Sequence, residues 1–258
     1  NVELGEFAGA ALKDKNYWKE YNGKILSDDK FDFSIYPVGY CGNRGKDYYG
    51  SFGETACYWT STVEDNYKDM FVKSFEVPHL VNRLVYGVFR KSKAQRSYEY
   101  AEKLNSLGIK SPAPIAYYTE RCGLLFSHSY YISRKSTCRY TFYDVIDNVK
   151  LENRELYLRC VGRMTAKMHE AGVYPLDYSG GNILLDVVEG EPQFELVDLN
   201  RMSFGRIDMD KGCRGFERLN VEPSALAIMA QEYAKERGFD EAKCVELVQQ
   251  YRWHKHQK

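Results

Sequence analysis

Hydrophobic and polar residues follow different patterns in the first 70 residues and in the rest of the chain. Residues 1–70 hold short aromatic runs broken by Gly, Asn and Asp, a pattern typical of short strands joined by many turns. The segment FVKSFEV that follows alternates in character and predicts a strand. Between Asn82 and Leu107 the pattern becomes helical, with an apolar stripe that ends in Tyr98, Ala101 and Leu104.

Strand and helix patterns alternate in the remainder of the chain. Pro112 and Pro114 interrupt the helical pattern, and GLLFSHSYYIS predicts another strand. Residues 152–171 predict a helix whose inward face holds Leu156, Val161, Met164 and Met168. The runs NILLDVV and QFELVDL predict two strands joined by a hairpin turn, and residues 223–251 predict helical structure interrupted at Gly238. We therefore expect an α+β fold whose C-terminal part is mostly helical.

Charge and cysteine content narrow the classes of function. Lys and Arg together number 36, as do Asp and Glu, so the formal net charge is zero and no global basic field for nucleic acid is present. No run approaches eighteen apolar residues, the length that predicts a membrane-spanning helix. The seven cysteines form no CxxC pair, which favours buried free thiols in a reducing compartment over a zinc site.

The stretch from Tyr174 to Asn200 carries the chemistry. Asp177 is followed five residues later by Asn182, and Asp198 follows the predicted hairpin. This is the order of parts in a protein-kinase-like phosphotransfer site, where the first Asp accepts the proton of the acceptor hydroxyl. The Asn and the second Asp supply the hard oxygen ligands that Mg²⁺ requires, and the hairpin returns the second carboxylate to the same phosphates.

Two candidate ATP-binding residues lie upstream. Lys73 lies in the strand FVKSFEV, and Glu99 lies in the helix that follows, with Glu102 one turn further along as an alternative. In a kinase the strand lysine contacts the α- and β-phosphates of ATP and the helix glutamate orients it. Each residue alone predicts little, because lysines on strands and DxxxxN turns are common on protein surfaces. The order of all the parts favours a kinase-like fold.

Residues 71–220 resemble the bacterial lipopolysaccharide kinases of the Kdo/WaaP type. The matching segments are VKSFEVPHLVNRLVYGVFRKSKAQRSYEYAEKL, GIKSPAPIAYY, SYYIS, LDYSGGNILL and FELVDLNRMSFG. The resemblance implies ATP- and Mg²⁺-dependent phosphorylation of a sugar hydroxyl of the lipopolysaccharide core, Kdo or heptose. It carries the catalytic role to Asp177, the metal ligands to Asn182 and Asp198, and the phosphate-binding role to Lys73.

The same resemblance implies where adenine and the substrate bind. The backbone around Ile132 and Ser133, within residues 131–134, corresponds to the hinge that meets adenine in ATP. The implied substrate is a lipid-linked sugar handled in the cytoplasm. The basic stretch Arg90–Lys93 suits peripheral contact with the anionic headgroups of the inner membrane, although a solvated helix face explains it as well.

Two departures from the kinase pattern stand out. Pro175 occupies the place where kinases usually carry a His, two residues before the catalytic Asp. In addition, residues 58–70 contain no GxGxxG, and nothing ahead of Lys73 resembles the two strands whose glycine-rich loop covers the phosphates. The sequence therefore predicts a truncated N-lobe and weak ATP binding.

Residues 5–67 resemble a different family, the FISUMP-type domains of bacterial surface proteins. The run DFSIYPVGY matches that family's GFSxLPxGY hallmark, and a glycine-rich stretch and YWTST follow. The resemblance implies a small, lectin-like, β-rich domain outside the cell. We therefore expect two domains, a FISUMP-like one over residues 1–70 and a kinase-like one over residues 71–258.

Several functions stay open from the sequence. The chain is an active kinase, or a catalytically weak pseudokinase, or a surface-binding module with a kinase remnant. The FISUMP-like segment and the kinase-like segment meet near residues 67–71. This junction is either a natural fusion or the product of a chimeric reading frame. The sequence leaves open the oligomeric state and the sugar that is phosphorylated.

Overall fold

The computed structural model describes residues 41–42, 55–59, 70–75, 90–122 and 125–256. The chain divides into two compact units. The first unit comprises residues 1–103 and 112–135, and the second comprises residues 104–111 and 136–258.

A five-stranded antiparallel sheet with the strand order β1-β2-β3-β5-β4 forms the first unit. Its strands are β1 (Cys41–Gly42), β2 (Thr55–Trp59), β3 (Met70–Phe75), β4 (Pro114–Cys122) and β5 (Leu125–Arg134). The predicted strand FVKSFEV is confirmed as β3. Because alternate residues of a strand share a face, Lys73 lies on the same face as Phe71 and Phe75.

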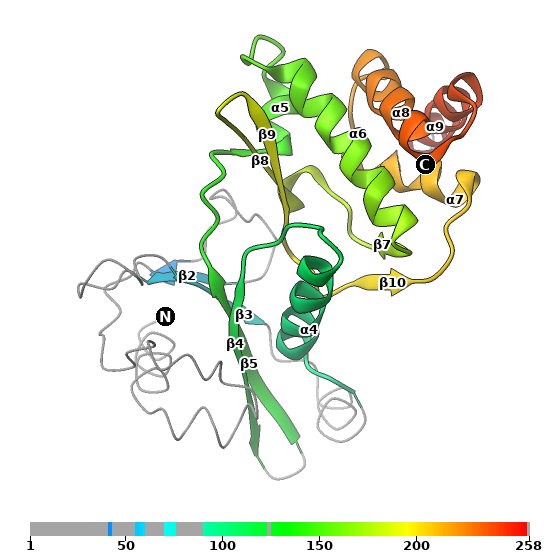
Figure 1. The fold of residues 1–258 in the computed structure, drawn as a ribbon. Coiled ribbons are helices and arrows are strands. Elements are labelled where there is room, and N and C mark those ends of the chain that lie inside the picture. Colours follow the sequence, from blue (N-terminus) through cyan, green and yellow to red (C-terminus); the bar gives the residue numbers. More distant parts are fainter. Residues whose placement is uncertain (1–40, 43–54, 60–69, 76–89, 123–124, 257–258) are drawn as a thin grey trace. The chain divides into compact units, whose positions relative to one another are not determined.

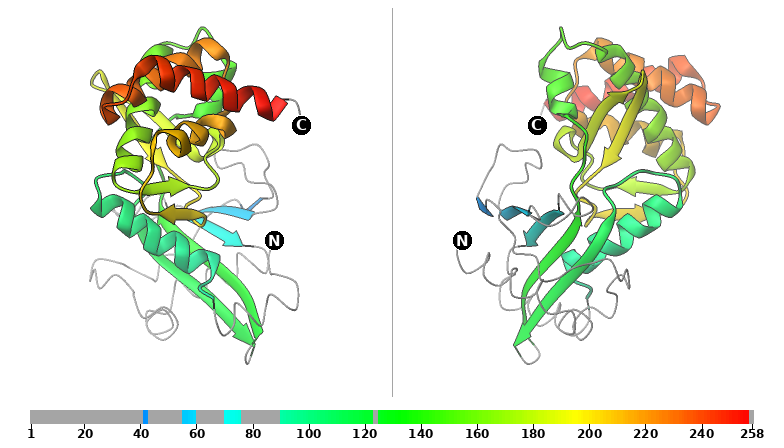
Figure 2. Two further views of the ribbon diagram at one scale, coloured as in Figure 1. Left: turned by 90° about the vertical axis from the view of Figure 1, so that its right-hand side faces the viewer. Right: turned by 60° about the vertical axis from the view of Figure 1, so that its left-hand side comes forward.

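Helix α4 (Lys93–Ser106) runs beside the β4–β5 hairpin (Figures 1 and 2). The rings of Tyr98 on the helix and Tyr117 on β4 have centroids 5.5 Å apart, and the predicted stripe is confirmed, because Tyr98, Ala101 and Leu104 are buried. The helical pattern is predicted from Asn82, but residues 82–89 lie outside the described residues, and α4 begins at Lys93. Ser92 explains the boundary, since its Oγ accepts a hydrogen bond from the Gln95 amide, as an N-cap residue does.

The expectation that the pair of N-lobe strands ahead of Lys73 is missing is wrong. Strands β1 and β2 lie ahead of β3 and pair with each other and with β3, in a register that sets Ala56 opposite Lys73. The lack of a GxGxxG motif does not exclude this pairing, because sheet pairing depends on backbone groups and tolerates many loop sequences. The predicted domain boundary at residues 70–71 falls inside β3, directly after its first residue. The remaining FISUMP-like residues, 5–40, 43–54 and 60–67, lie outside the described residues.

The second unit combines helices with two small antiparallel sheets, β6-β8-β9 and β10-β7. In chain order its elements are β6 (Tyr140–Thr141), α5 (Phe142–Asp147), α6 (Arg154–Glu170), β7 (Val173–Pro175), η1 (Gly180–Asn182), β8 (Ile183–Val188), β9 (Glu191–Leu196), β10 (Met202–Phe204), α7 (Met209–Arg214), η2 (Gly215–Leu219), α8 (Pro223–Arg237) and α9 (Glu241–His256). The predicted helix, hairpin and helical tail are confirmed as α6, β8–β9 and α8–α9. Gly238 separates the last two helices with a φ of 63°, a left-handed cap that suits glycine.

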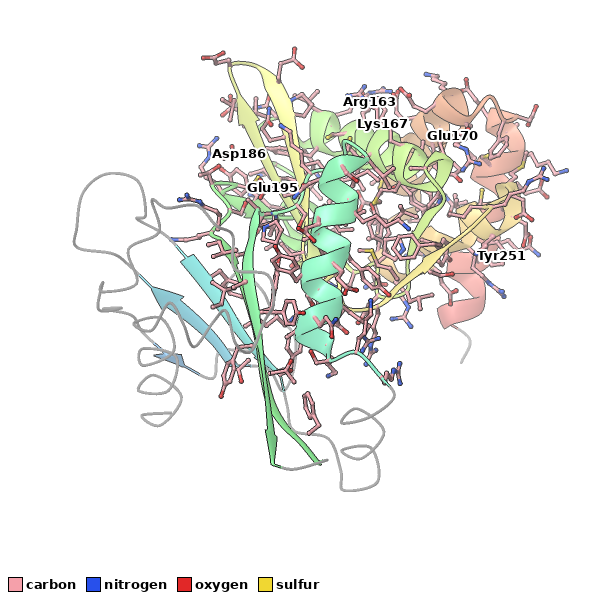
Figure 3. The ribbon with its side chains drawn as sticks, turned by 60° about the horizontal axis from the view of Figure 1, so that its bottom comes forward. Arg163, Lys167, Glu170, Asp186, Glu195 and Tyr251 are labelled. Atoms are coloured by element: carbon pink, nitrogen blue, oxygen red, sulfur yellow. The ribbon has the colours of Figure 1, made fainter. Side chains whose placement is uncertain are left out.

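Helix α6 packs closely against α8, and α9 packs on α8 in turn (Figures 1 and 2). Gly162 permits the approach, because a Cβ at that position would lie 2.5 Å from the Met229 carbonyl oxygen of α8. Glu232 of α8 forms ion pairs with Arg159 and Arg163 of α6, and Figure 3 labels Arg163 on that helix. Val161 and Met168 are buried as predicted, whereas Leu156 and Met164 are only partly buried.

Among the described residues, none of the helices has the length and apolar character that a membrane span requires.

Candidate active site

The loop between β7 and β8 folds around the predicted DxxxxN spacing. Asn182 Nδ2 donates a 2.9 Å hydrogen bond to the backbone carbonyl of Asp177, which also accepts from the Ser179 amide. The spacing of five residues therefore allows this hydrogen bond, which holds Asn182 next to Asp177. No described residue donates a hydrogen bond to Asn182 Oδ1, so this oxygen is available to a cation.

Pairing of β8 with β9 returns the chain to this loop. Ile183 lies opposite Leu196, and the Val197 amide donates a 2.9 Å hydrogen bond to the Asn182 carbonyl. Asp198 therefore follows at the same end of the hairpin as Asn182, as predicted. Its backbone has a φ of 56°, a left-handed conformation that is uncommon for a residue with a side chain and that concentrates at functional sites. Asn200 Nδ2 donates a hydrogen bond to Asp198 Oδ1.

Asn182 and Asp198 both offer the hard oxygen atoms that Mg²⁺ prefers. Two such side chains are too few for Mg²⁺ alone, which takes waters and phosphate oxygens as its other ligands. Their role as metal ligands stays a prediction. Within the described part of the chain, no group of three or more His, Cys, Asp and Glu side chains is placed to hold a metal ion.

A buried tyrosine anchors the loop to α6. Tyr178, next to Asp177, is 2% exposed, and its hydroxyl lies 2.7 Å from Thr165 Oγ1. Since Thr165 donates its own proton to the Val161 carbonyl, the Tyr178 hydroxyl is the donor of the pair. Burial raises the pKa of Tyr178 well above its ordinary value. Gly180 leaves room for Tyr143 of α5, whose ring would lie 2.7 Å from a Cβ at that position.

A second buried group supports the strand that leads into the loop. His169 of α6 stacks on Tyr174 of β7 with ring centroids 5.4 Å apart, and its Nδ1 lies 3.0 Å from the Tyr233 hydroxyl. Burial, together with the positive charges of Arg237 and Lys211, lowers the pKa of His169 to about 3, so the imidazole is neutral. These contacts fix β7 in a chain where Pro175 replaces the usual bracing His.

The Asp177 carboxylate faces two guanidinium groups. Arg218 Nη1 of η2 donates a 2.8 Å hydrogen bond to Asp177 Oδ1, and Arg201 Nη1 lies 3.9 Å from Asp177 Oδ2. The Arg201 carbonyl accepts from the Leu176 amide, which holds the chain after Asp198 beside the chain before Asp177. Neither arginine is predicted from the sequence. Arg201 lies only three residues after the predicted Asp198, so its position in the chain could have suggested it. Arg218 lies 41 residues after Asp177, and no motif or spacing indicates it.

Lys73, Glu99 and Glu102, the upstream candidates, all belong to the first unit. The Lys73 side chain is buried, and its Nζ lies 5.4 Å from the ring centroid of Phe75. Glu99 accepts hydrogen bonds of 2.9 and 2.8 Å from Lys91 Nζ, so its carboxylate is engaged near the start of α4. Glu102 interacts with the Tyr98 hydroxyl and contributes, after burial, to raising the pKa of that group to about 12. The pairing of Lys73 with either glutamate stays a prediction.

Ile132 and Ser133, the predicted adenine contacts, lie near the end of β5. Both are buried, and Ile132 is paired with Val72 on one side and with Ala116 on the other. Strand β5 ends at Arg134, and residues 135–139, which follow it, belong to no strand or helix. The role of Ile132 and Ser133 in binding adenine stays a prediction.

The antiparallel sheet with α4, followed by the loop and hairpin of the helical unit, defines a protein-kinase-like fold. Residues 49–250 match the Lipopolysaccharide kinase (Kdo/WaaP) family, so the chain belongs to that family. The match begins ahead of the predicted boundary at residue 71 and takes in part of the FISUMP-like segment.

One solved structure, that of WaaP, agrees on the fold. WaaP, in a complex with acyl carrier protein, superposes with a TM-score of 0.55 at 15% sequence identity, over 93% of this chain and 97% of that chain. WbdD gives a TM-score of 0.48 at 14% identity, over 83% of this chain and 50% of that chain. No curated protein matches the sequence.

The low pKa of His169 predicts that acid destabilises the fold. Below its ordinary pKa near 6.5 the unfolded chain binds a proton that the folded chain excludes down to about pH 3. The unfolding free energy should therefore fall by about 1.4 kcal/mol per pH unit in this window. In denaturant titrations at pH 7.5 and pH 5, wild type should lose about 2 kcal/mol more than His169→Gln. Tyr233→Phe, which keeps the imidazole, should retain the wild-type slope, and identical slopes for wild type and His169→Gln would contradict the assignment.

Proposed function

We propose that this chain is an ATP-dependent kinase that phosphorylates a sugar hydroxyl of the lipopolysaccharide core, Kdo or heptose. The observation that carries the proposal is the closure of the Asp177–Asn182 loop beside Asp198. That arrangement belongs to a chain of the lipopolysaccharide kinase family. Kinase chemistry needs a base, metal ligands and a phosphate contact, and each has a candidate here.

Asp177 is the proposed base. Arg218 engages Oδ1, so Oδ2 is the oxygen that accepts the proton of the acceptor hydroxyl as that hydroxyl attacks the terminal phosphate of ATP. Asn182 Oδ1 and the Asp198 carboxylate would hold Mg²⁺, which neutralises the negative charge on the phosphates when it is bound. Lys73 would contact the α- and β-phosphates, with Glu99 or Glu102 to orient it.

Two strands, β1 and β2, pair in the same sheet ahead of β3, which carries Lys73. With two strands ahead of Lys73, the reason to expect weak ATP binding no longer holds. The proposed substrate is a lipid-linked sugar, met at the cytoplasmic face of the inner membrane, where ATP is present.

Replacing the proposed base should stop phosphate transfer without stopping nucleotide binding. We expect Asp177→Asn to lower kcat by roughly 10²–10⁴-fold, the contribution of a positioned base. Transfer of radiolabelled phosphate from ATP to a Kdo–lipid acceptor measures kcat, and calorimetry with ATP measures affinity. Asp147→Asn makes the same change at an exposed position of α5 and should have no effect. Equal transfer rates for Asp177→Asn and wild type would remove Asp177 from the mechanism.

Magnesium should bind together with ATP and not by itself. We expect Mg²⁺ and ATP together to raise the melting temperature of the wild-type protein by several degrees and Mg²⁺ alone to leave it unchanged, because two side-chain ligands are too few. Asn182→Ala and Asp198→Ala should each abolish the magnesium-dependent part of the shift. Strong calorimetric binding of Mg²⁺ without nucleotide would be incompatible with this site.

The glutamate that orients Lys73 can be identified by parallel substitution. Lys73→Met should weaken ATP affinity and transfer, and the substitution of its true partner should reproduce the loss in transfer. Since Lys91 already engages Glu99, we expect Glu102→Gln to lower kcat by at least about tenfold and Glu99→Gln to have a smaller effect. The reverse order in the same transfer assay would restore Glu99 to the role.

A further inference from the structure

Positive charge beside Asp177 comes from outside its own loop. The loop from Asp177 to Asn182 reads DYSGGN and holds no Lys or Arg. Arg201 follows Asp198 by three residues, and Arg218 belongs to η2, so both guanidinium groups reach the carboxylate from other segments. Two guanidinium groups therefore approach one carboxylate at the position where the acceptor hydroxyl must arrive.

The two arginines are engaged differently. Arg218 donates a hydrogen bond to Asp177 Oδ1, whereas Arg201 stands 3.9 Å from Oδ2, beyond hydrogen-bonding distance. No described residue accepts a hydrogen bond from the Arg201 side chain, which is 60% exposed. Its donors are therefore available, while the Leu176–Arg201 backbone hydrogen bond fixes the position of its main chain.

Stability does not account for this arrangement. Ion pairs between groups exposed to this degree contribute little to folding, about 0–1 kcal/mol. A guanidinium group, in contrast, offers a planar fork of donors that matches a carboxylate or a phosphate in bidentate geometry. Arg201 thus has the free donors, the exposure and the fixed backbone that recognition of an anion requires.

We propose that Arg201, supported by the charge of Arg218, binds an anionic group on the acceptor next to the hydroxyl that is phosphorylated. The inference rests on the proposed kinase function and narrows its substrate class to acidic or already phosphorylated sugars. The anion lies on the acceptor and not on ATP, because Asp177 Oδ2, which Arg201 faces, is the oxygen that receives the acceptor's proton. A carboxylate and a phosphate share this chemistry.

Binding of paired acidic and neutral sugars tests the proposal without depending on turnover. Calorimetry with wild-type protein, Mg²⁺ and a non-hydrolysable ATP analogue compares Kdo with its methyl ester, and a heptose phosphate with the free heptose. We expect at least one acid to bind about tenfold or more tightly than its neutral partner, the size of one charge-assisted contact. The pair that shows the difference identifies carboxylate or phosphate as the group recognised.

Variants then assign the preference. Arg201→Gln should abolish the preference for the acid and leave the affinity for the neutral partner and for the ATP analogue unchanged. Arg206→Gln removes the same charge from an exposed position nearby in sequence and should keep the preference. The proposal is overturned if neither acid is preferred by wild type, if the preference survives Arg201→Gln, or if the loss appears in the analogue affinity instead. Preferred binding of an acid without any phosphate transfer would contradict only the kinase function.

Discussion

The hydrogen bond from the Val197 amide to the Asn182 carbonyl is the constraint on which the site of the second unit depends. It closes the open end of the β8–β9 hairpin, so two segments fifteen residues apart meet at one point. The Asn182 side chain then bonds back to Asp177, and the left-handed turn at Asp198 begins directly after Val197. The loop, the hairpin and the turn are therefore linked to one another. A shift in the register of the β8–β9 pairing would displace the proposed base and both proposed metal ligands together.

Buried hydrogen-bonded pairs fix the loop and β7 against the helical core. Tyr178 and Thr165 satisfy each other inside the core, as do His169 and Tyr233, and an unpaired member of either pair would cost about 1–3 kcal/mol. Such pairs define one arrangement of the loop more sharply than apolar packing does, because a hydrogen bond restricts direction as well as distance. The stacking of His169 on Tyr174 fixes β7, so the loop is supported even though Pro175 stands where kinases usually carry a His.

The sequence predicted the second unit better than the first. Helix α6 and the hairpin follow strong periodic patterns, and the Asp177–Asn182 spacing encodes a local hydrogen bond, so local signals sufficed. The pairing of β1 and β2 into the sheet of β3 was missed, because both strands are short and their pairing is a long-range property that no local pattern records. Arg218 was missed for the same reason, since only folding brings it 41 residues back along the chain to Asp177.

The electrostatics of Asp177 separate two tasks that a general base must combine. A carboxylate without cationic neighbours repels an anionic acceptor, whereas cationic neighbours bonded to both of its oxygens would leave neither oxygen open to the acceptor hydroxyl. The structure places the short contact on Oδ1 and the long one near Oδ2, so the oxygen proposed to take the proton is the less engaged of the two. An acceptor that brought its own anion to Arg201 would offset the charge of that guanidinium. Binding of the acceptor and placement of its hydroxyl at Asp177 would then depend on the same pair of arginines, which couples recognition of the acceptor to the chemical step.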